Sequence, residues 1–162
     1  GICYCELGDF QKGLVIFNEI ASQDNPKYAE DVVKAKENIK LYTNNRIAKL
    51  QGENDFDGII AVADEMLAVN PQDALAQKIR LQALFDKKDY AGVIASAEEA
   101  AAGQTDEEER SDVYFILGAA YNARTMPQQA IDALSKVTAG ANVAAAQKTV
   151  AQLKENAAKA NS

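Results

Sequence analysis

A short pattern recurs four times along this chain, and a repeat at near-constant spacing constrains the fold more than any other feature of a sequence. In each copy a small or polar, helix-breaking residue precedes an aromatic position and an apolar helical stretch. The copies open at Gly8, Asn54, Lys88 and Thr125. The aromatic position is occupied by Phe10, Phe56, Tyr90 and Pro127, which are separated by 46, 34 and 37 residues. These spacings are close to the length of two antiparallel helices, so the pattern predicts a repeated helix-turn-helix unit.

Helix-capping residues occur where such units need them, because a side-chain oxygen at the N-cap accepts unpaired N–H groups of the first turn. The N-caps predicted for the second helix of each unit are Asp9, Asp55, Asp89 and Thr125. Two pairs also fit the capping-box spacing, Thr125 with Gln128 and Thr105 with Glu108. The acidic run 106–109 is then expected at a helix N-terminus, where the helix dipole favours negative charge. The alternative is an acidic docking patch for a basic partner.

Caps, prolines and the spacing of apolar residues predict the bounds of the helices. The first helices of the units are expected at about 1–7, 26–51, 72–86 and 106–123. The second helices follow the capped turns; the first of them ends near Ala21, and the fourth carries Ile131, Leu134 and Val137. An amphipathic helix is expected at 143–159. A terminal helix with one polar face can cap a stack of helix pairs.

Composition favours an all-α protein and excludes several functions. The chain has 162 residues, a formal net charge of −7, and neither His nor Trp. Without His there is no Ser-His-Asp triad, Cys-His dyad or imidazole metal ligand, and no phosphate-binding or calcium loop is present, so we expect no enzyme activity, cofactor or metal. The negative charge argues against nucleic-acid binding. The longest apolar run, 113–121, is far shorter than the roughly 20 residues that membrane insertion needs.

The two cysteines, Cys3 and Cys5, lie two positions apart in a predicted helix. They would point about 200° away from each other, so a disulfide between them is not expected. We interpret them as small buried hydrophobic residues; the alternative is a redox or metal-binding role.

The repeated units resemble the tetratricopeptide repeat family over about 140 residues. The clearest copy matches the family's Leu-Gly-x-x-Tyr pattern and the small residue of the family's second helix. The matching residues are Gly118, Tyr121, Ala130, Ile131 and Leu134. The first copy matches from Gly1 and Tyr4 to Phe17. At the Gly and Tyr positions, the second and third copies carry Ile47, Leu50, Leu81 and Leu84. The family's usual Trp is absent from every copy, and Pro127 replaces an aromatic residue.

The resemblance implies a single domain over 1–162, an all-α right-handed α-α superhelix of about 3.5 units. The expected repeats are 1–25 (partial), 26–70, 71–104 and 105–140, followed by a capping helix at 143–159. Because the chain opens inside a first helix, we expect it to be part of a longer array. On this interpretation Ile2, Tyr4 and Leu7 face an absent neighbour, and that N-terminal edge is expected to be covered by a partner or to mediate self-association.

In this family the first helices line a concave groove that holds a protein or peptide segment. Carried onto this chain, the groove positions are Asn44, Gln51, Lys78, Gln82, Phe85, Asp112, Phe115 and Asn122. Phe85, Phe115 and Asn44 are the expected anchors, although the two Phe side chains can equally belong to the core. Only Asn44 and Lys78 resemble the cluster with which one subclass grips a C-terminal carboxylate, so we expect no such clamp.

The sequence therefore favours a non-enzymatic protein-interaction module that binds a peptide or protein partner through the groove. One alternative is a structural spacer or self-assembly segment of a larger protein. Another is the helical part of a cell-envelope protein, as in bacterial nutrient-uptake lipoproteins; cytoplasmic and periplasmic locations both stay open.

Overall fold

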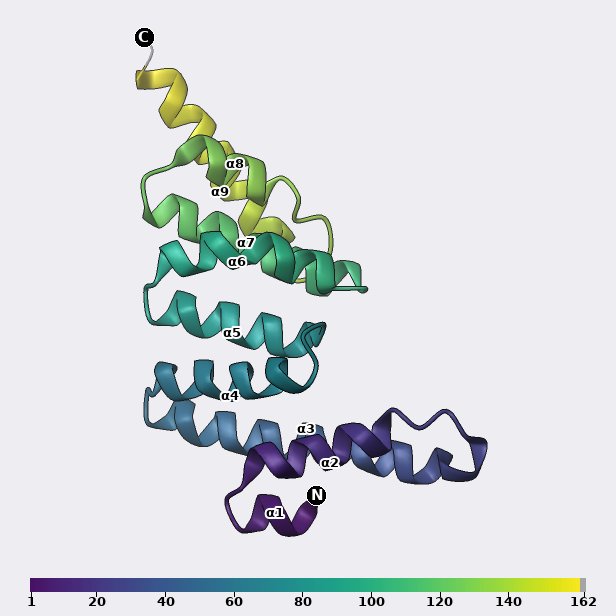
Figure 1. The fold of residues 1–162 in the computed structure, drawn as a ribbon. Helices are drawn as coiled ribbons and strands as arrows, with labels where there is room; N and C mark the ends of the chain where they lie inside the picture. The colour runs from purple at the N-terminus through teal and green to yellow at the C-terminus, as the bar shows by residue number, and fades with distance from the viewer. Residues whose placement is uncertain (161–162) are drawn as a thin grey trace. The chain divides into compact units, whose positions relative to one another are not determined.

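The computed structural model describes residues 1–160, and within that range the chain is entirely helical, with no strand (Figure 1). Its nine α-helices in this range, together with one short 3-10 helix at Pro26–Tyr28, confirm the predicted all-α class. The α-helices are α1 (Ile2–Glu6), α2 (Phe10–Ala21), α3 (Ala29–Gly52), α4 (Phe56–Val69), α5 (Ala74–Asp86), α6 (Tyr90–Gly103), α7 (Glu107–Ala123), α8 (Pro127–Leu134) and α9 (Val143–Ala160). Residues 161 and 162 of the predicted domain lie outside the described range.

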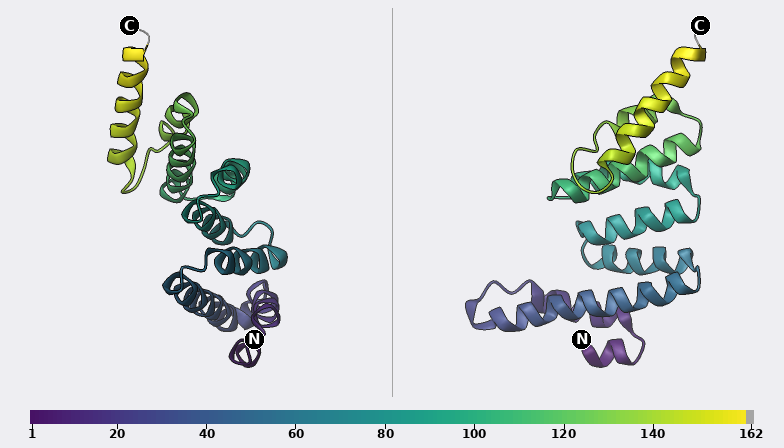
Figure 2. Two further views of the ribbon diagram at one scale, coloured as in Figure 1. Left: turned by 90° about the vertical axis from the view of Figure 1, so that its left-hand side faces the viewer. Right: turned by 180° about the vertical axis from the view of Figure 1, so that it is seen from behind.

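The chain divides into two compact units, Gly1–Ala76 and Gln77–Ser162. In the first unit α2 packs against α1, α3 and α4, and α3 also packs against α4. In the second unit α7 packs against α6 and α8, and α8 packs against α9. Figure 2 shows α2 alongside α3 in the first unit and α9 alongside α8 in the second. Neighbouring helices therefore bury their apolar faces against each other within each unit.

The four turns that join the paired helices have the same backbone structure. Each contains one residue in the left-handed region, with φ of 83° at Gly8, 54° at Asn54, 67° at Lys88 and 56° at Thr125. In every turn the N–H of this residue donates to the carbonyl three residues earlier, and the next N–H donates to the carbonyl five residues before its own position. This pair of bonds satisfies the last carbonyls of the first helix. The sequence repeat is thus a structural repeat at the level of the backbone.

Three of the predicted N-caps of the second helices are confirmed. The side chains of Asp9, Asp55 and Asp89 each accept a hydrogen bond from the backbone N–H three residues later, over 3.2, 2.8 and 2.9 Å. In each turn this capping residue directly follows the left-handed residue. The end of one helix and the start of the next are therefore fixed within two adjacent positions.

The predicted cap at Thr125 is wrong. Thr125 occupies the left-handed position itself, its hydroxyl donates to the Arg124 carbonyl, and the N-cap is Met126, which has no capping oxygen. The Gln128 side chain donates to Asp132 rather than closing a capping box. The turn geometry thus places the cap one residue later than the sequence suggested.

The predicted cap at Thr105 with Glu108 is also wrong. Asp106 is the N-cap of α7, and its side chain accepts from the Glu109 N–H over 3.0 Å. The acidic run nevertheless lies at a helix N-terminus, as predicted, because Glu107, Glu108 and Glu109 form the first turn of α7.

In each of the four helix-turn-helix repeats, the two helices carry side chains of complementary size at one pair of equivalent positions. A Cβ added at Gly1 would collide with the Phe17 ring, and one added at Gly118 would collide with Leu134. In the second and third repeats the equivalent residues of the first helix are large, Ile47 and Leu81. The equivalent residues of the second helix are the fully buried Ala63 and Ala97. Each repeat thus has one large and one small residue at these equivalent positions, and the large one lies on the second helix in the first and fourth repeats and on the first helix in the other two.

Two further sequence predictions need correction. Val137 is buried as expected, but it lies beyond the end of α8 at Leu134, in the segment leading to α9, where it packs with Leu134 and Ala146. Cys3 is exposed rather than buried, and helix α1 as a whole has no buried residue. Cys5 is half-buried, and this burial raises the pKa of its thiol.

Candidate functional site

The predicted groove residues of the second unit lie on α5 and α7, and one ion-pair cluster joins them. The ammonium group of Lys78 lies 2.9 Å from the Asp112 carboxylate and also pairs with Glu109. Burial alone would lower the pKa of Lys78, but the hydrogen bonds that Lys78 donates to the two carboxylates outweigh it and raise that pKa. Asn142 donates a further bond to Asp112 over 2.9 Å. Lys78 and Asp112 therefore satisfy each other's charge.

The two predicted aromatic anchors contact other parts of the second unit. Phe85 is half-buried and meets the Tyr90 ring edge-on, with centroids 5.5 Å apart. Phe115 is half-buried and packs against the cluster of Leu134, Val137 and Ala146. Both rings thus contribute to packing between helices, which was the alternative interpretation of these residues.

The other groove candidates are polar and exposed. On α5, Gln82 donates to Asp86 one turn later, and on α7 Asn122 is exposed. Asn44 and Gln51 belong to the first unit, where both are exposed on α3. Within the second unit, then, the structure brings Lys78 and Asp112 together and leaves Gln82 and Asn122 as polar surface.

Most of the exposed apolar side chains lie outside the predicted groove, in the part of the chain that includes the predicted N-terminal edge of Ile2, Tyr4 and Leu7. Among the described residues, seven of the eight exposed large hydrophobic side chains belong to the first 41 positions: Ile2, Tyr4, Leu7, Val15, Tyr28, Val33 and Leu41. Contiguous exposed apolar surface on a protein commonly marks an interaction site. The first unit therefore holds the stronger candidate.

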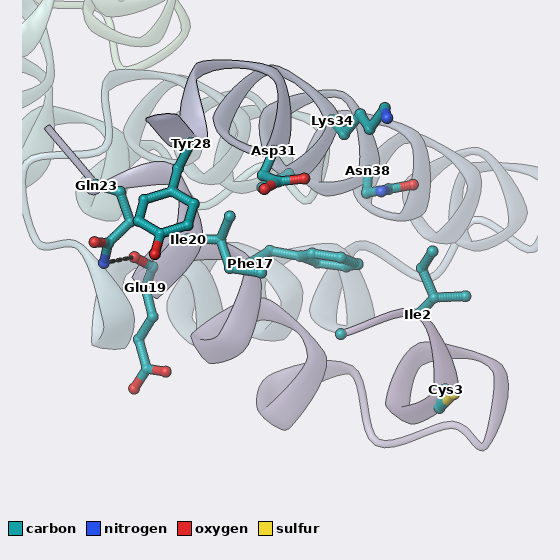
Figure 3. Close-up of a pocket in the computed structure, with 12 residues that line it drawn as sticks. Ile2, Cys3, Phe17, Glu19, Ile20, Gln23, Tyr28, Asp31, Lys34 and Asn38 are labelled. Atoms are coloured by element: carbon teal, nitrogen blue, oxygen red, sulfur yellow. Dashed lines mark hydrogen bonds between the residues drawn. The ribbon is translucent and has the colours of Figure 1, made fainter. Parts of the chain in front are cut away.

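A pocket of about 740 Å³ lies in this unit between α1, α2 and the start of α3; we call it the α2–α3 pocket (Figure 3). Ile2, Phe17, Ile20 and Tyr28 lie along it in a row. The facing wall is one side of α3, where Asp31, Lys34, Ala35 and Asn38 recur at helical spacing. The pocket is thus an apolar floor bordered on one side by polar groups.

The charged side chains of the polar wall differ in whether they form an ion pair. The Lys34 ammonium pairs with Glu30 at 2.7 Å, and that hydrogen bond raises the pKa of Lys34 and lowers the pKa of Glu30. In Figure 3 the Asp31 carboxylate is directed toward Ile20 and Phe17, whereas the Lys34 side chain points away from them. Asp31 has no ion-pair partner among the described residues. The Glu19 carboxylate points away from the floor.

Helix α1 closes one end of the pocket and is held there by specific contacts. Cys5 packs against Gly13 on α2, where a Cβ would collide with its sulfur. The Tyr42 hydroxyl of α3 donates to the Glu6 carboxylate over 2.7 Å, and the Tyr42 ring stacks with Phe17 at 6.2 Å. This hydrogen bond is the main cause that raises the pKa of Tyr42 to about 12. Tyr4 on α1 and Leu7 just beyond its end are exposed, and Ile2 at the pocket is also exposed.

The sequence held one signal that pointed to this pocket. The helix expected at 26–51 is far longer than the other first helices, and α3 indeed has 24 residues against 12 in α2 and 5 in α1. A helix rises about 1.5 Å per residue, so α1 covers only part of the surface where α2 and α3 pack together. The excess length of this helix was visible in the sequence, whereas the residues that line the pocket are brought together by the packing of three helices.

Within the described residues, no group of three or more His, Cys, Asp or Glu side chains is placed to hold a metal ion. No helix in that same range combines the length and apolarity needed to span a bilayer. Comparison with protein-family models, with curated proteins and with solved structures found no significant match to this chain. The arguments about function therefore rest on the residues and their geometry.

Proposed function

We propose that this chain is a non-enzymatic protein-interaction module, built as a tetratricopeptide-like array of helix pairs. The four equivalent turns and the size-complementary helix crossings support the repeat architecture. The single observation that carries the binding function is that seven of the eight exposed large hydrophobic side chains in the described range belong to residues 1–41, two of which, Ile2 and Tyr28, line the α2–α3 pocket. Burial of apolar surface is the main driving force of protein association, and this surface supplies it.

The concave groove expected from the family resemblance stays a second binding surface within this proposal. In the second unit its exposed residues are Gln82 and Asn122, while Phe115 contributes to the core and Lys78 is neutralised by Asp112. A peptide held there would depend on polar contacts and on the half-buried Phe85. The apolar surface of the first unit offers more area to desolvate, so we assign it the larger share of binding.

Affinity capture followed by reconstitution tests the proposal. The immobilised chain is exposed to extract of its source cell, and each retained protein is purified and titrated against the wild type and two variants. Ile20→Asn alters the α2–α3 pocket, and the double variant Gln82→Ala/Asn122→Ala alters the polar groove without touching the core. We expect a reconstituted partner whose affinity falls in Ile20→Asn. If no purified protein binds the wild type, the interaction function is wrong.

Self-assembly is the second candidate function, and one observation favours it. Leu7, which directly follows α1, is 82 % exposed, and α1 itself has no buried residue and exposes Ile2 and Tyr4. Sedimentation velocity over a range of concentrations tests this candidate, with Leu7→Ser as the variant because so exposed a side chain contributes little to folding. A wild-type dimer that dissociates in Leu7→Ser supports self-assembly, and a strict monomer excludes it.

A further inference from the structure

We infer that helix α9 is a lid that opens while the rest of the second unit stays folded. The lid hinges at Gly140, and a hydrogen bond from Asn142 to Asp112 is the latch that holds it closed. This device lies wholly within the second unit and goes beyond the interaction function proposed for the first. It is carried by the shallow burial of α9, by a cavity between α8 and α9, and by the hydrogen bonds of the connection 135–142.

Helix α9 is attached to its unit by few apolar contacts. Between positions 143 and 159 the one buried residue is Ala146, whereas α7 has six buried residues and α8 has four. In the cluster that joins α9 to α7 and α8, α9 contributes only the half-buried Val143 and Val150 besides Ala146. An element with few buried apolar contacts opens at a lower free-energy cost than the core of its domain. The burial therefore predicts that α9 is held less stably than α7 and α8.

The packing between α8 and α9 is also incomplete. A cavity of about 530 Å³ lies between the end of α8 and α9, and Leu134, Val137, Val143 and Val150 are among the residues that line it. Protein cores leave few such voids, because each one removes dispersion contacts from the side chains around it. In its closed position α9 thus lacks part of the contact energy that a core helix has.

The connection between α8 and α9 has a fixed end on α7. The backbone N–H groups of Thr138 and Ala139 both donate to the buried Ser111 hydroxyl oxygen, over 3.2 and 3.1 Å. The Thr138 hydroxyl also donates to the Glu107 carboxylate over 2.9 Å. These three bonds hold the connection to α7 as far as Ala139, so a movement of α9 has to begin beyond that residue.

The next residue, Gly140, is suited to be the hinge. It has φ of 83°, in the left-handed region that a side chain disfavours, and a Cβ added there would collide with the Glu108 side chain. A glycine also moves between backbone regions at little steric cost. Rotation at Gly140 can therefore swing α9 outward without breaking the bonds to Ser111.

The latch lies on the other side of this hinge. Asn142, directly before the start of α9, donates to the Asp112 carboxylate over 2.9 Å. This bond has to break when α9 swings away. The Asp112 carboxylate stays paired with Lys78 of α5, so opening leaves no unpaired charge behind.

Opening changes the surface of the second unit. Phe115, Leu134 and Val137 pack in the cluster that α9 completes, and they lose that cover when α9 moves away. The second unit therefore presents this apolar surface only while the lid is open.

Thiol labelling of the full chain tests the inference, with the native Cys3 and Cys5 replaced by Ser and Ala. The reporter is Ala146→Cys on the lid, and the matched control is Ala120→Cys on α7, because both alanines have 0 % exposure. Each labelling rate is divided by the rate in the unfolded chain and measured at increasing urea concentration. Amide hydrogen exchange of α9 and α7 in the wild type makes the same comparison without any substitution.

We expect Ala146→Cys to be labelled at least about tenfold faster than Ala120→Cys without urea, as a lower opening free energy requires. Its rate should change little with urea because local opening exposes little surface, whereas labelling of Ala120→Cys should accelerate steeply. Asn142→Ala should speed labelling at position 146 by about two- to tenfold, the effect of one hydrogen bond, and should leave position 120 unchanged. The exposed Asn122→Ala on α7 is the control and should change neither rate.

Equal labelling rates with equal urea dependence at positions 146 and 120 would overturn the lid, because α9 would then open only with its whole unit. Equal protection of the α9 and α7 amides in the wild type would overturn it in the same way. If Asn142→Ala speeds both reporters equally, or neither, the latch at Asp112 is wrong.

Discussion

Gly118 on α7 lies so close to Leu134 on α8 that a Cβ added to the glycine would collide with the leucine side chain and lie 3.3 Å from the Leu134 backbone nitrogen. In the preceding helix-turn-helix repeat the sizes of the equivalent pair are reversed, with Leu81 on the first helix and the fully buried Ala97 on the second. Both repeats thus combine one large and one small residue at equivalent positions, and the helix that carries the small residue differs between them.

Exchanging the sizes at this crossing tests that relationship. Gly118→Leu alone should be strongly destabilising, by about 3 kcal/mol, because its side chain would overpack against the Leu134 side chain and lie close to the Leu134 backbone. Leu134→Ala alone should cost about 2–5 kcal/mol through the cavity that it leaves. The double variant recreates the Leu81/Ala97 arrangement, so chemical denaturation should show a favourable coupling energy of about 1–3 kcal/mol. Simple additivity of the two losses would contradict the equivalence of the two crossings.

The strained position of Thr125 predicts a stabilising substitution. A β-branched residue in the left-handed region costs roughly 1–2 kcal/mol, and Thr125 has φ of 56° there. Thr125→Gly should therefore raise the free energy of unfolding by about 1 kcal/mol, with a smaller gain for Lys88→Gly. The exposed loop residue Thr105 provides the control, because its φ is not positive and Gly there only adds chain entropy to the unfolded state. A stability loss in Thr125→Gly equal to that in Thr105→Gly would argue against the strain.

How far the sequence predicts this fold can be judged at the same turns. Asp9, Asp55 and Asp89 were predicted correctly as caps because a carboxylate in front of an apolar helical stretch has an unambiguous role. Thr125 was assigned wrongly because a Thr hydroxyl can act as an N-cap acceptor, whereas in this turn the residue at position 125 adopts the left-handed backbone conformation and the N-cap is the next residue. The Met126 cap has no side-chain signature, so only the shared turn geometry identifies it.

The Glu6–Tyr42 hydrogen bond makes the attachment of α1 sensitive to alkaline pH. The folded state raises the pKa of Tyr42 to about 12, above its ordinary value of 10.0, so the folded state holds the phenolic proton more tightly than the unfolded state does. The resulting stabilisation is fully present below pH 10 and is lost as the pH rises toward 12. Tyrosinate absorbance should show one Tyr titrating late, and Tyr42→Phe should remove that transition. A titration curve unchanged by Tyr42→Phe would contradict the assignment.

The candidate site was less predictable than the fold. Family resemblance pointed to the first helices of the units, where Phe115 instead contributes to a core cluster and Lys78 is neutralised by Asp112 and Glu109. The α2–α3 pocket depends on how α1, α2 and α3 pack together and on the direction of the Asp31 side chain. Neither property is encoded in residue spacing, although the unusual length of α3 was a visible signal.

The most direct test of this account is a map of where a bound partner protein contacts the chain. Amide chemical shifts of the isotope-labelled protein are followed during titration with a partner protein purified after affinity capture. We predict that the shifts concentrate at the α2–α3 pocket, around Ile20, Gln23, Asp31 and Asn38. Shifts concentrated instead at Gln82, Phe85 and Asn122, or no saturable shift at all, would contradict the claim that the first unit carries the binding site.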